Sequence, residues 1–464
     1  MLRIFNHYLS PLTLFLVLSE NLLILGTLYL STLIKLGDIE PSSIAAPAFF
    51  SRALTLALLC QLCLYFHDLY DLKVVRDRRE LHVRLLQALG VCSMVVAILY
   101  WIFPSLLLGQ GVFLLAVLLL LVLVSIWRVA FNWISHRREF KRPILILGTG
   151  SLAKKLCSEV LDRPDLGMRI LGFVSDDVNL VGTSLINPRV LGHYSDLARI
   201  VESERSVQIV VAMEESRGRL PVKELLDLKM RGASIEEGTA LYERITGKIA
   251  VENLRPSWLI FSEGFRKSRW VLGLKRVSGI LLSLVGLIVT APIMLVIAVL
   301  IKTESRGPVL FKQNRVGENG KIFRLLKFRS MWEDAEALTG PVWACADDRR
   351  VTRVGRWIRR LRMDELPQFI NVLRGDMSFV GPRPERPHFV EQLSEQIPFY
   401  NQRHTVKPGI TGWAQINFHY GMSMEDTLEK LQYDLFYIKN MSFTLDLSII
   451  FQTIKIVLSG RGAH

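Results

Sequence analysis

Cysteine is scarce in this chain, and acidic residues are outnumbered by basic ones. Only five cysteines occur among 464 residues, and they are scattered. The one close pair, Cys60 and Cys63, lies in an apolar run, where no aqueous metal site or disulfide framework is expected. We therefore predict a structural or lipid-facing role for this pair, and we expect the soluble parts to be reduced and cytosolic.

The shortage of acidic residues leaves a formal net charge of +14, from 57 Lys and Arg residues against 43 Asp and Glu residues. Such an excess suits a partner made of anionic lipid headgroups, phosphates or nucleic acid. Composition alone does not choose among these partners.

Hydrophobic residues are abundant, at 50% of the chain, and the mean hydropathy of +0.30 is one that few soluble proteins reach. These values predict a membrane protein. The first apolar run leads directly to another, so we expect no cleavable signal peptide. Four runs are close to the roughly 20 apolar residues that a bilayer requires: Leu12–Ile34, Phe49–Phe66, Leu85–Phe103 and Val112–Ile134.

The charges on the links between these runs predict their orientation. The link after the first run, with Lys35, Asp38 and Glu40, is slightly acidic, and residues 104–111 between the third and fourth runs are uncharged. The other two links are basic, so the positive-inside rule places both ends of this four-helix bundle in the cytoplasm. Their basic residues include Lys73, Arg76, Arg78, Arg79 and Arg84 after the second run and Arg137, Arg138, Lys141 and Arg142 after the fourth.

A fifth apolar run, Val277–Ile301, is long enough to cross a bilayer, but basic residues flank it on both sides. Both ends therefore favour the cytoplasm. Pro292 near its middle removes an intrahelical hydrogen bond. We predict a re-entrant helix, broken at Ala291 and Pro292, in preference to a kinked true span. The re-entrant path would keep the C-terminal part in the cytosol.

The middle of the chain has the pattern of a parallel α/β domain. A buried strand over 144–147 runs into Gly148-Thr149-Gly150 and a helix from Ser151, giving Gly-x-Gly-x-x-Ala with Ala153. A second strand, Met168–Val174, ends beside Asp176, where a ribose-binding acid would sit. Further strands over 207–213 and 233–235 and a helix over 221–231 continue the alternation. Residues 141–255 are therefore predicted to be Rossmann-like.

Ligand binding by this domain is a separate question from its fold. The glycines serve the tight turn whether or not a pyrophosphate is present, so a scaffold or oligomerisation domain remains open. A rival function is an NAD-dependent oxidoreductase or sugar-nucleotide dehydratase. Short-chain members of that class use Tyr-x-x-x-Lys, and none of the 11 tyrosines has Lys four residues on. That absence weakens the rival.

Near the C-terminal end, Asp364 and Glu365 follow a run of arginines. The arginines are Arg353, Arg356, Arg359, Arg360 and Arg362. Cations that hold a phosphate beside a carboxylate suit phosphate chemistry, with the carboxylate acting directly or through a metal. Taken alone, the pair also fits a solvated acidic helix start. Its surroundings favour the catalytic interpretation.

Six blocks in order carry a resemblance over the last 190 or so residues. They are Gly307-Pro308-Val309-Leu310-Phe311-Lys312-Gln313-x-Arg315-x-Gly317, Lys327-Phe328-Arg329-Ser330-Met331, Asp364-Glu365-Leu366-Pro367-Gln368, Asn371-Val372-Leu373-x-Gly375-Asp376-Met377-Ser378, Gly381-Pro382-Arg383-Pro384 and Lys407-Pro408-Gly409-Ile410-Thr411-Gly412-Trp413. This part resembles the bacterial polyprenyl-phosphate sugar-1-phosphate transferases, the monotopic phosphoglycosyl transferases. The preceding helices and α/β domain resemble the long members of that family.

The resemblance implies a ping-pong reaction. Asp364 would attack the β-phosphorus of a UDP-sugar, UMP would leave, and the phosphosugar would pass to undecaprenyl phosphate. Glu365 would position Asp364 or share Mg²⁺ with it. A carboxylate among arginines is ionised at neutral pH and needs no general base, and the phosphorus centre needs cations around it.

Several basic residues are candidates for the two phosphates. Arg383, stiffened by two prolines, is a candidate donor clamp or part of a rigid turn. Lys327 and Arg329 alternate along a likely strand and are expected on one face. Lys312 and Arg315 would hold the lipid phosphate or headgroups, and the sequence does not divide the donor and lipid roles among Lys327, Arg329, Arg353, Arg359, Arg383, Lys312 and Arg315. Asp347-Asp348-Arg349 is either a polar turn or a source of a metal ligand.

The predicted protein is thus a multi-domain integral membrane α/β enzyme of the bacterial inner membrane. Its catalytic domain, mainly helical, faces the cytoplasm and starts exopolysaccharide or O-antigen-type assembly. Mg²⁺ is the expected cofactor, and UDP-sugar, undecaprenyl phosphate and membrane lipids are the expected partners, with a homodimer and no nucleic acid. A non-enzymatic scaffold that binds UDP-sugar is the remaining rival. The predicted parts are the bundle 1–140, the α/β domain 141–255, a linker 256–274 and the catalytic domain 275–464 with its re-entrant helix 277–301.

The last apolar segment, Leu445–Leu458, has hydrophobic residues at helical spacing with Lys455 among them. This pattern fits an interfacial helix or a helix of the core. We favour the core.

Overall fold

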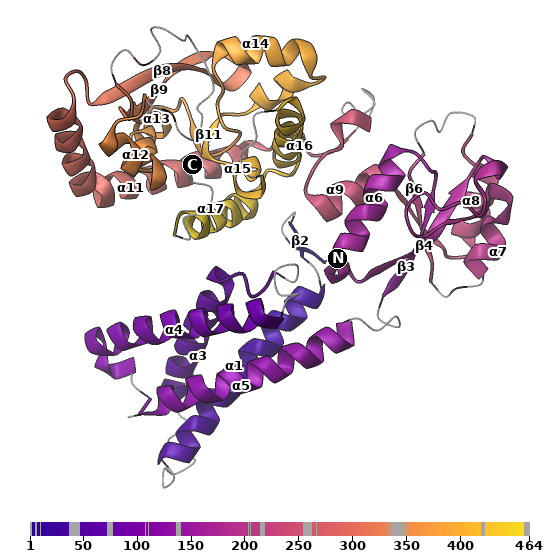
Figure 1. The fold of residues 1–464 in the computed structure, drawn as a ribbon, viewed down its shortest axis with the longest axis horizontal. Helices are drawn as coiled ribbons and strands as arrows, with labels where there is room; N and C mark the ends of the chain where they lie inside the picture. Colours follow the sequence, from indigo (N-terminus) through magenta and orange to yellow (C-terminus); the bar gives the residue numbers. More distant parts are fainter. Residues whose placement is uncertain are drawn as a thin grey trace. The chain divides into compact units, whose positions relative to one another are not determined.

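The chain divides into two compact units in the computed structural model, with the boundary between Leu241 and Tyr242 (Figure 1). The structure describes residues 2–4, 7–9, 11–36, 47–71, 78–106, 108–109, 111–135, 141–202, 204, 206–213, 219–253, 262–265, 267–332, 335, 348, 350–418 and 423–458.

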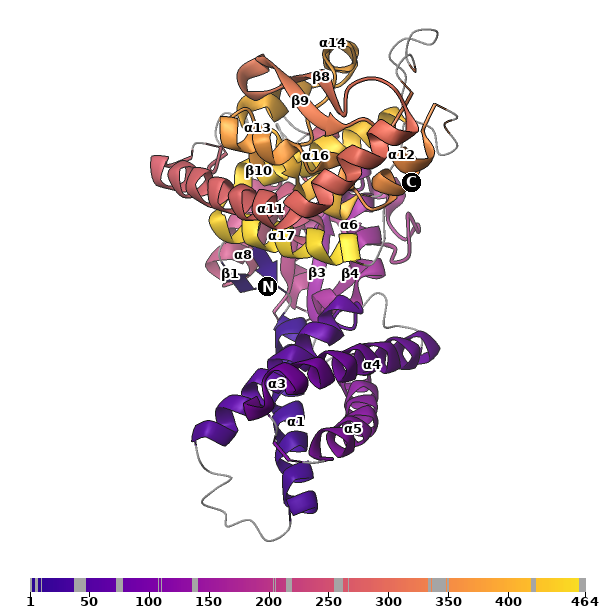
Figure 2. The same ribbon diagram turned by 90° about the vertical axis from the view of Figure 1, so that its left-hand side faces the viewer.

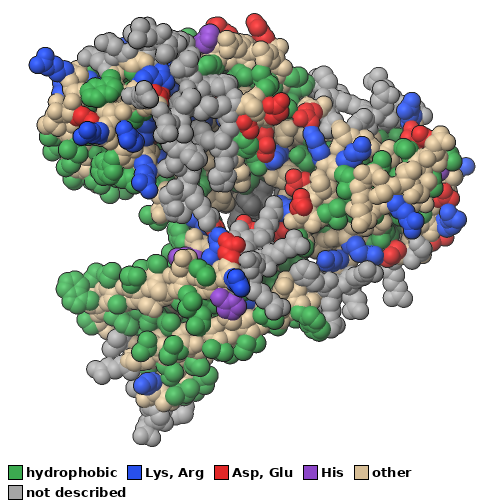
Figure 3. Space-filling view, viewed as in Figure 1, with side chains coloured by type: hydrophobic (Ala, Val, Ile, Leu, Met, Phe, Trp, Pro, Cys, Tyr) green, Lys and Arg blue, Asp and Glu red, His purple; other side chains and the backbone are tan. Residues whose placement is uncertain are grey.

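The first unit begins with a paired β1 (Leu2–Ile4) and β2 (His7–Leu9), followed by long apolar helices. These helices are α1 (Pro11–Leu36), α3 (Pro47–Phe66), α4 (Arg78–Ile102) and α5 (Val112–Ser135), with the short helix η2 (Pro104–Leu106) before α5. Each of the four long helices is long and apolar enough to cross a membrane, as predicted. Hydrophobic side chains cover most of the helix surface visible in Figure 3.

These four helices pack through small and branched apolar side chains. Leu28, Ala57, Leu85 and Ala116, one from each helix, belong to one buried cluster that also contains Cys60, Cys63 and Cys92. The close pair of cysteines therefore lies in the helix core, which agrees with a structural role. The four cysteines that the structure describes are all buried and free.

A buried ion pair joins the first and last of these helices. Arg128 Nε of α5 lies 2.7 Å from Glu20 Oε1 of α1, and both side chains are almost fully buried. Arg128 Nη1 also donates to the carbonyl of Leu69, just after α3, and the guanidinium lies over the Tyr70 ring. One cation thus joins three segments of the chain.

The α/β part of this unit is a five-stranded, wholly parallel sheet in the order β5-β4-β3-β6-β7. Numbered in chain order the strands run 3-2-1-4-5, which is the Rossmann strand order without its sixth strand, and the order reverses between β3 and β6. The strands are β3 (Arg142–Leu147), β4 (Met168–Ser175), β5 (Val190–His193), β6 (Gln208–Val211) and β7 (Ser234–Glu237). The helices are α6 (Ser151–Asp162), η4 (Pro164–Leu166), η5 (Val178–Leu180), η6 (Tyr194–Asp196), α7 (Leu197–Glu202) and α8 (Val222–Met230).

Four of the five strands coincide with those predicted from the apolar runs, which confirms the parallel α/β fold. β5 was not predicted. It is only four residues long, and alternate side chains are partly exposed, so its sequence has no continuous apolar run.

Residues 242–253 pack in the second unit, although the predicted boundary lies at 255. They comprise the end of α9 (Gly238–Thr246) and η7 (Val251–Asn253). Ile249 and Val251 belong to the C-terminal core, and Trp413 Nε1 donates to the Gly247 carbonyl at 2.9 Å. Glu243 accepts hydrogen bonds from Lys439 and Asn440.

The second unit is built on α11 (Arg269–Glu304), a fifth helix long and apolar enough to cross a membrane. The helix is continuous through Ala291 and Pro292, so the break predicted there is not an interruption of the helix. Figures 1 and 2 show that α11 is bent along its length. A proline inside a helix removes one backbone hydrogen bond and commonly causes such a bend.

The rest of this unit is mainly helical, as predicted, with two small sheets. The antiparallel hairpin of β8 (Leu310–Val316) and β9 (Ile322–Phe328) encloses η8 (Glu318–Gly320), and β10 (Ser378–Val380) pairs in parallel with β11 (Gly409–Thr411). The helices are α12 (Arg353–Arg360), η9 (Met363–Glu365), α13 (Gln368–Arg374), α14 (Pro387–Gln396), η10 (Tyr400–Thr405), α15 (Trp413–Asn417), α16 (Met424–Asn440) and α17 (Phe443–Leu458).

Helix α11 supports the elements that carry the acidic pair. A Cβ on Gly286 would lie only 2.9 Å from the Phe369 ring, so the absence of a side chain lets α11 and α13 approach closely. Arg276 donates to the last carbonyls of α13, Val372 and Leu373. At the other end of α11, the Glu304 carboxylate accepts from the first backbone N–H groups of α12, where a helix dipole favours an anion.

Helix α17 differs from the core helix we favoured. Its inner face is buried at Leu445, Asp446 and Ile449, but its other face exposes a row of large apolar side chains. The row consists of Leu447, Phe451, Ile454, Val457 and Leu458.

Candidate active site

Asp364 and Glu365 lie on η9, a single turn between two helices. Arg362 takes the left-handed conformation (φ 53°) and ends the path from α12, and η9 then leads through Pro367 into α13. Helix α13 is fixed to β9 by the buried Asn371 side chain, which accepts from Leu326 N and donates to Arg324 O. The Asn371 side chain therefore holds the acidic turn close to the backbone of strand β9.

Two cations meet on Glu365. Lys327 Nζ lies 2.8 Å from Glu365 Oε1, and Arg383 Nη2 lies 2.6 Å from the same oxygen. Asp364 Oδ2 is 3.9 Å from Lys327 Nζ, beyond hydrogen-bond length. Among the described residues, no hydrogen bond engages the Asp364 carboxylate. Glu365 is fixed, whereas the Asp364 oxygens are available for reaction.

The net pKa shift differs between the two carboxylates. Burial raises the pKa of Asp364; the nearby cations Lys327, Arg359 and Arg383 oppose this, and the negative charge of Glu365 adds to it. Burial would also raise the pKa of Glu365, but Arg383 and Lys327 outweigh it and hold that pKa well below its usual range. Glu365 therefore stays ionised while Asp364 titrates at a higher pH than an ordinary aspartate.

Arg383 reaches Glu365 from a segment held by close backbone packing. Gly381 follows β10 and lies against β11, where a Cβ would be 2.5 Å from the Lys407 carbonyl oxygen. A Cβ on Gly409 or on Gly412 would likewise collide with backbone atoms of Gly381. The glycines of two predicted blocks therefore allow two strands to meet at the base of the Arg383 loop.

Two further arginines hold this loop by its carbonyl oxygens. Arg403 Nη2 donates to Arg383 O at 3.0 Å and to Asp434 Oδ2 at 2.8 Å, and both Arg403 and Asp434 are buried. Arg315 Nη1 donates to Pro384 O at 3.0 Å, and burial lowers the pKa of Arg315 to about 10. Sequence reasoning missed Arg403 and Asp434, because their 31-residue separation gives no local signal.

Arg315 therefore supports the loop, and its partners are protein atoms. Besides Pro384 O, it contacts the side chains of Gln313 and Glu385. This differs from its predicted place on a lipid phosphate. Lys312 is exposed, and its register partner is Leu326. Because successive side chains of a strand alternate, Lys312 lies on the opposite face of the hairpin from Lys327.

Arg329, which we expected on the face of Lys327, bonds to the end of α11. Strand β9 ends at Phe328, and Arg329 Nη2 donates to the carbonyl and hydroxyl oxygens of Ser305 at the end of α11. The Arg329 guanidinium is buried, and its Nε and Nη1 have no hydrogen-bond partner in the described structure.

The two candidate arginines of α12 differ in their surroundings. Arg359 Nε donates to Ser330 Oγ at 2.8 Å; burial lowers the pKa of Arg359, and the charge of Asp364 opposes that effect. Arg353 is exposed at the start of the helix, where its backbone N–H bonds to Glu304. Of the two, Arg359 is the one placed to act on Asp364.

The predicted dinucleotide turn lies at the carboxyl end of β3. Gly148 adopts a positive φ of 113°, and a Cβ there would lie 2.7 Å from the Ala212 carbonyl oxygen. Gly150 is the N-cap of α6 and Ala153 is buried in its first turns. Asp176 follows β4 and lies 3.7 Å from Arg219. The turn has the expected shape, and ligand binding remains a prediction.

The available metal ligands are the two adjacent carboxylates. No group of three His, Cys, Asp or Glu side chains with metal-binding geometry occurs in the described part of the chain. Mg²⁺ commonly uses one or two carboxylates together with substrate phosphates and water, so Asp364 and Glu365 fit an ion shared with a diphosphate. Asp348 instead pairs with Arg350 at 2.5 Å; Asp347 and Arg349 lie outside the described residues.

Comparison with known proteins agrees with this geometry. Residues 270–460 match the bacterial sugar transferase family, and residues 66–227 match a family described as a CoA-binding domain. A UDP-glucose:undecaprenyl-phosphate glucose-1-phosphate transferase of Escherichia coli is 33% identical over 344 residues, which are 72% of each chain. The chain belongs to the bacterial sugar transferase family.

Two other relatives are named for N-acetylgalactosamine and for glucose. The UDP-N-acetylgalactosamine-undecaprenyl-phosphate N-acetylgalactosaminephosphotransferase of Aeromonas hydrophila is 48% identical over 48% of this chain and 52% of its own. The undecaprenyl-phosphate glucose phosphotransferase of Komagataeibacter xylinus is 36% identical over 70% of this chain and 61% of its own. The chain thus spans about half to three fifths of the length of these two relatives.

The raised pKa of Asp364 predicts the pH at which the rate of the first chemical step falls on the acidic side (the acidic limb). As pH falls through that pKa, the carboxylate is protonated and stops attacking, so the apparent pKa of the first chemical step should lie above the ordinary 3.8. Arg359→Gln removes a cation that lowers this pKa and should shift the limb to higher pH. Arg360→Gln, an exposed neighbour on α12, is the matched control. A limb below pH 4, or equal shifts in both variants, would contradict the assignment.

Arg403 is expected to position Arg383. Arg403→Met leaves Asp434 buried without its partner and should destabilise the protein by about 3–5 kcal/mol. Arg403→Met with Asp434→Leu removes both charges, and its thermal stability should recover. Because Arg383 O stays unsupported in both variants, KM for the sugar donor should stay raised by about tenfold in the double variant. A wild-type KM in a stable double variant would limit Arg403 to a structural role.

Proposed function

We propose that the protein transfers a sugar 1-phosphate from a UDP-sugar to undecaprenyl phosphate through a covalent intermediate on Asp364. The observation that carries this proposal is the unequal treatment of two adjacent carboxylates. Glu365 is ionised and held by Lys327 and Arg383, whereas Asp364 is buried without a hydrogen bond to its carboxylate among the described residues. A desolvated carboxylate with free lone pairs is a competent nucleophile.

In the first step, an Asp364 carboxylate oxygen forms a bond to the β-phosphorus of the donor. The bond between that phosphorus and the bridging oxygen breaks, and UMP leaves with the electron pair. Arg383 and Lys327 neutralise the charge that develops on the phosphoryl oxygens. Arg359 stabilises the ionised form of Asp364 before attack.

In the second step, an oxygen of the lipid phosphate attacks the same phosphorus and displaces the Asp364 carboxylate. The product is the sugar linked by a diphosphate to the lipid, and the free carboxylate is restored. Because UMP leaves before the lipid phosphate reacts, a soluble donor and a membrane-bound acceptor use one nucleophile in turn.

The donor set described above fits Mg²⁺, which Asp364 and Glu365 would hold together with the donor diphosphate. When bound, such an ion would neutralise phosphate charge. The names of the three relatives include glucose and N-acetylgalactosamine, so the sugar is left open. A role at the start of exopolysaccharide or O-antigen-type assembly, and a homodimer, are further proposals on the same resemblance.

We also propose that α1, α3, α4 and α5 form a membrane-spanning bundle in the bacterial inner membrane and that α11 is re-entrant. Five helices of spanning length and the basic links support this topology. A re-entrant path with its turn at the bend of α11 would keep both ends of the helix in the cytoplasm. Because α11 bonds to α12 and α13, Asp364 would then lie near the depth of the lipid phosphates.

The activity is tested by UMP release from a panel of UDP-sugars with Mg²⁺, with and without undecaprenyl phosphate. Wild-type protein should release UMP from at least one donor and gain the mass of a phosphosugar without the acceptor. Asp364→Asn should lose both signals, by about 10³-fold or more, because an amide is a poor nucleophile. No UMP from any donor would reject the transferase, and an adduct on Asp364→Asn would place the nucleophile elsewhere.

The topology is tested by cysteine labelling from outside intact cells, after replacement of the five native cysteines. Arg306→Cys, beyond the end of α11, should react only after permeabilisation. Ser105→Cys, between α4 and α5, is the positive control and should react in intact cells. Strong labelling at position 306 in intact cells would establish α11 as a true span.

A further inference from the structure

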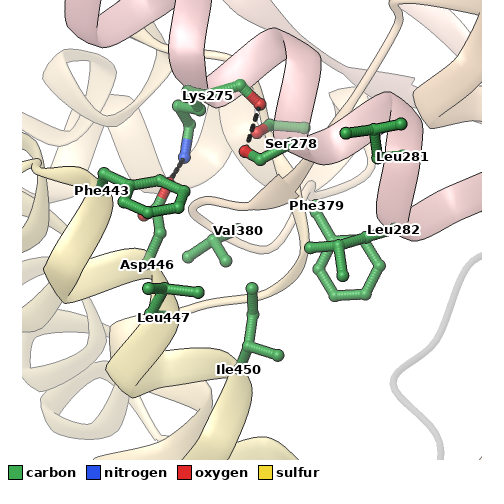
Figure 4. A pocket seen from close by; sticks show the side chains of 11 residues that line it. Lys275, Ser278, Leu281, Leu282, Phe379, Val380, Phe443, Asp446, Leu447 and Ile450 are labelled. Atoms are coloured by element: carbon green, nitrogen blue, oxygen red, sulfur yellow. Dashed lines mark hydrogen bonds and ion pairs between the residues drawn. The ribbon is translucent and has the colours of Figure 1, made fainter.

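A cavity of about 220 Å³ lies where α11 crosses α17, with β10 as a third wall (Figure 4). Leu281 and Leu282 come from α11, Phe379 and Val380 from β10, and Ile450 from α17. Figure 4 shows these side chains around a common space that extends between the two helices.

The polar groups at the cavity have partners within the protein. Lys275 Nζ bonds to Asp446 Oδ2 at 2.7 Å and to the hydroxyl of Tyr437, which itself donates to Asp446 Oδ1. Ser278 Oγ donates to the Lys275 carbonyl. Apart from Ser378, the remaining lining is apolar, so the cavity suits a hydrocarbon and offers little to a polar ligand.

The cavity opens onto the apolar surfaces of two helices. Leu281 of α11 and Leu447 of α17 line it and are 57% and 47% exposed. Leu447 begins the exposed apolar row of α17, and α11 is apolar enough to lie in a membrane. An occupant that enters from the lipid phase therefore meets apolar side chains along its whole path.

One wall of the cavity lies close in the chain to Arg383, which contacts the reactive pair. Val380 forms its wall, and Arg383, three residues later, bonds to Glu365. Three residues of extended chain span at most about 10 Å, and the Arg383 side chain covers the further distance to Glu365. A molecule with a phosphate at Asp364 and a hydrocarbon chain attached would thus reach the cavity with a later part of its chain.

We propose that this cavity binds the isoprenoid chain of the acceptor beyond its first unit, and so selects a long polyprenyl phosphate. The inference rests on the proposed function, because that function makes a lipid phosphate the second substrate. Each methylene buried adds about fourfold to affinity. The chain should therefore lower KM for the acceptor and leave the reaction with the soluble donor unchanged.

The two half-reactions separate these effects. We would load wild-type protein and Ile450→Trp, which fills the cavity, with a UDP-sugar and follow the phosphosugar adduct by intact mass. The adduct would then be discharged with undecaprenyl phosphate or with dimethylallyl phosphate, which has a single isoprenoid unit. Ile454→Trp, one turn further along α17 on its exposed face, is the matched control.

Ile450→Trp should form the adduct at the wild-type rate but need at least tenfold more undecaprenyl phosphate for discharge. Its discharge by dimethylallyl phosphate and both reactions of Ile454→Trp should stay as in wild type. Unchanged discrimination between the long and short acceptors in Ile450→Trp would overturn the proposal, and would leave the cavity to an acyl chain of a surrounding phospholipid.

Two controls distinguish a misfolded variant, and a failure of the proposed function, from a failure of the cavity proposal. If Ile450→Trp does not form the adduct, Leu447→Gln decides, because this exposed side chain at the cavity mouth is replaceable without loss of the core. It should raise KM for undecaprenyl phosphate severalfold, and an unchanged KM would reject the cavity. If wild-type protein forms no adduct with any donor, the transferase function itself fails.

Discussion

Two adjacent carboxylates withdrawn from water impose the constraint on which the C-terminal unit depends. Both cannot be ionised there without nearby cations. The structure satisfies Glu365 with Lys327 and Arg383, and that choice leaves Asp364 under-compensated. A more even division of the cations would stabilise both acids and would weaken the proposed nucleophile. In the proposed mechanism, reactivity at Asp364 would thus be a consequence of the strong pairing of its neighbour.

The cations need support of their own, and hydrogen bonds from side chains to the backbone provide most of it. Lys327 stands on β9, which the Asn371 side chain joins to α13. Arg383 stands on a loop whose carbonyl oxygens are held by Arg403 and Arg315. Close glycine packing between β10 and β11 fixes the base of that loop, and α11 lies under α13. The positions of Lys327 and Arg383 therefore depend on many contacts away from the acidic pair.

Much of the fold follows from local sequence, whereas the support of the site does not. Apolar runs give the long helices and strands such as β3, and the ordered blocks bring Asp364, Lys327 and Arg383 to one place. Alternation along a strand does not reveal that Arg329, just past the end of β9, bonds to Ser305. Arg315 and Arg403 look like any surface cations, and only tertiary packing turns them toward carbonyl oxygens. Helix α17 shows the same limit, since periodicity reveals its apolar faces but not which neighbour covers them.

The ion pair between Glu20 and Arg128 links positions 108 residues apart, and this spacing has a consequence for biosynthesis. In the proposed topology, α1 leaves the ribosome with an acidic side chain that has no counter-charge until α5 has been made. An unpaired charge in lipid is unfavourable. Glu20 should therefore stay near the cytoplasmic headgroups until Arg128 arrives. Assembly of the helices would be completed by the last of them, shortly before the α/β domain is translated.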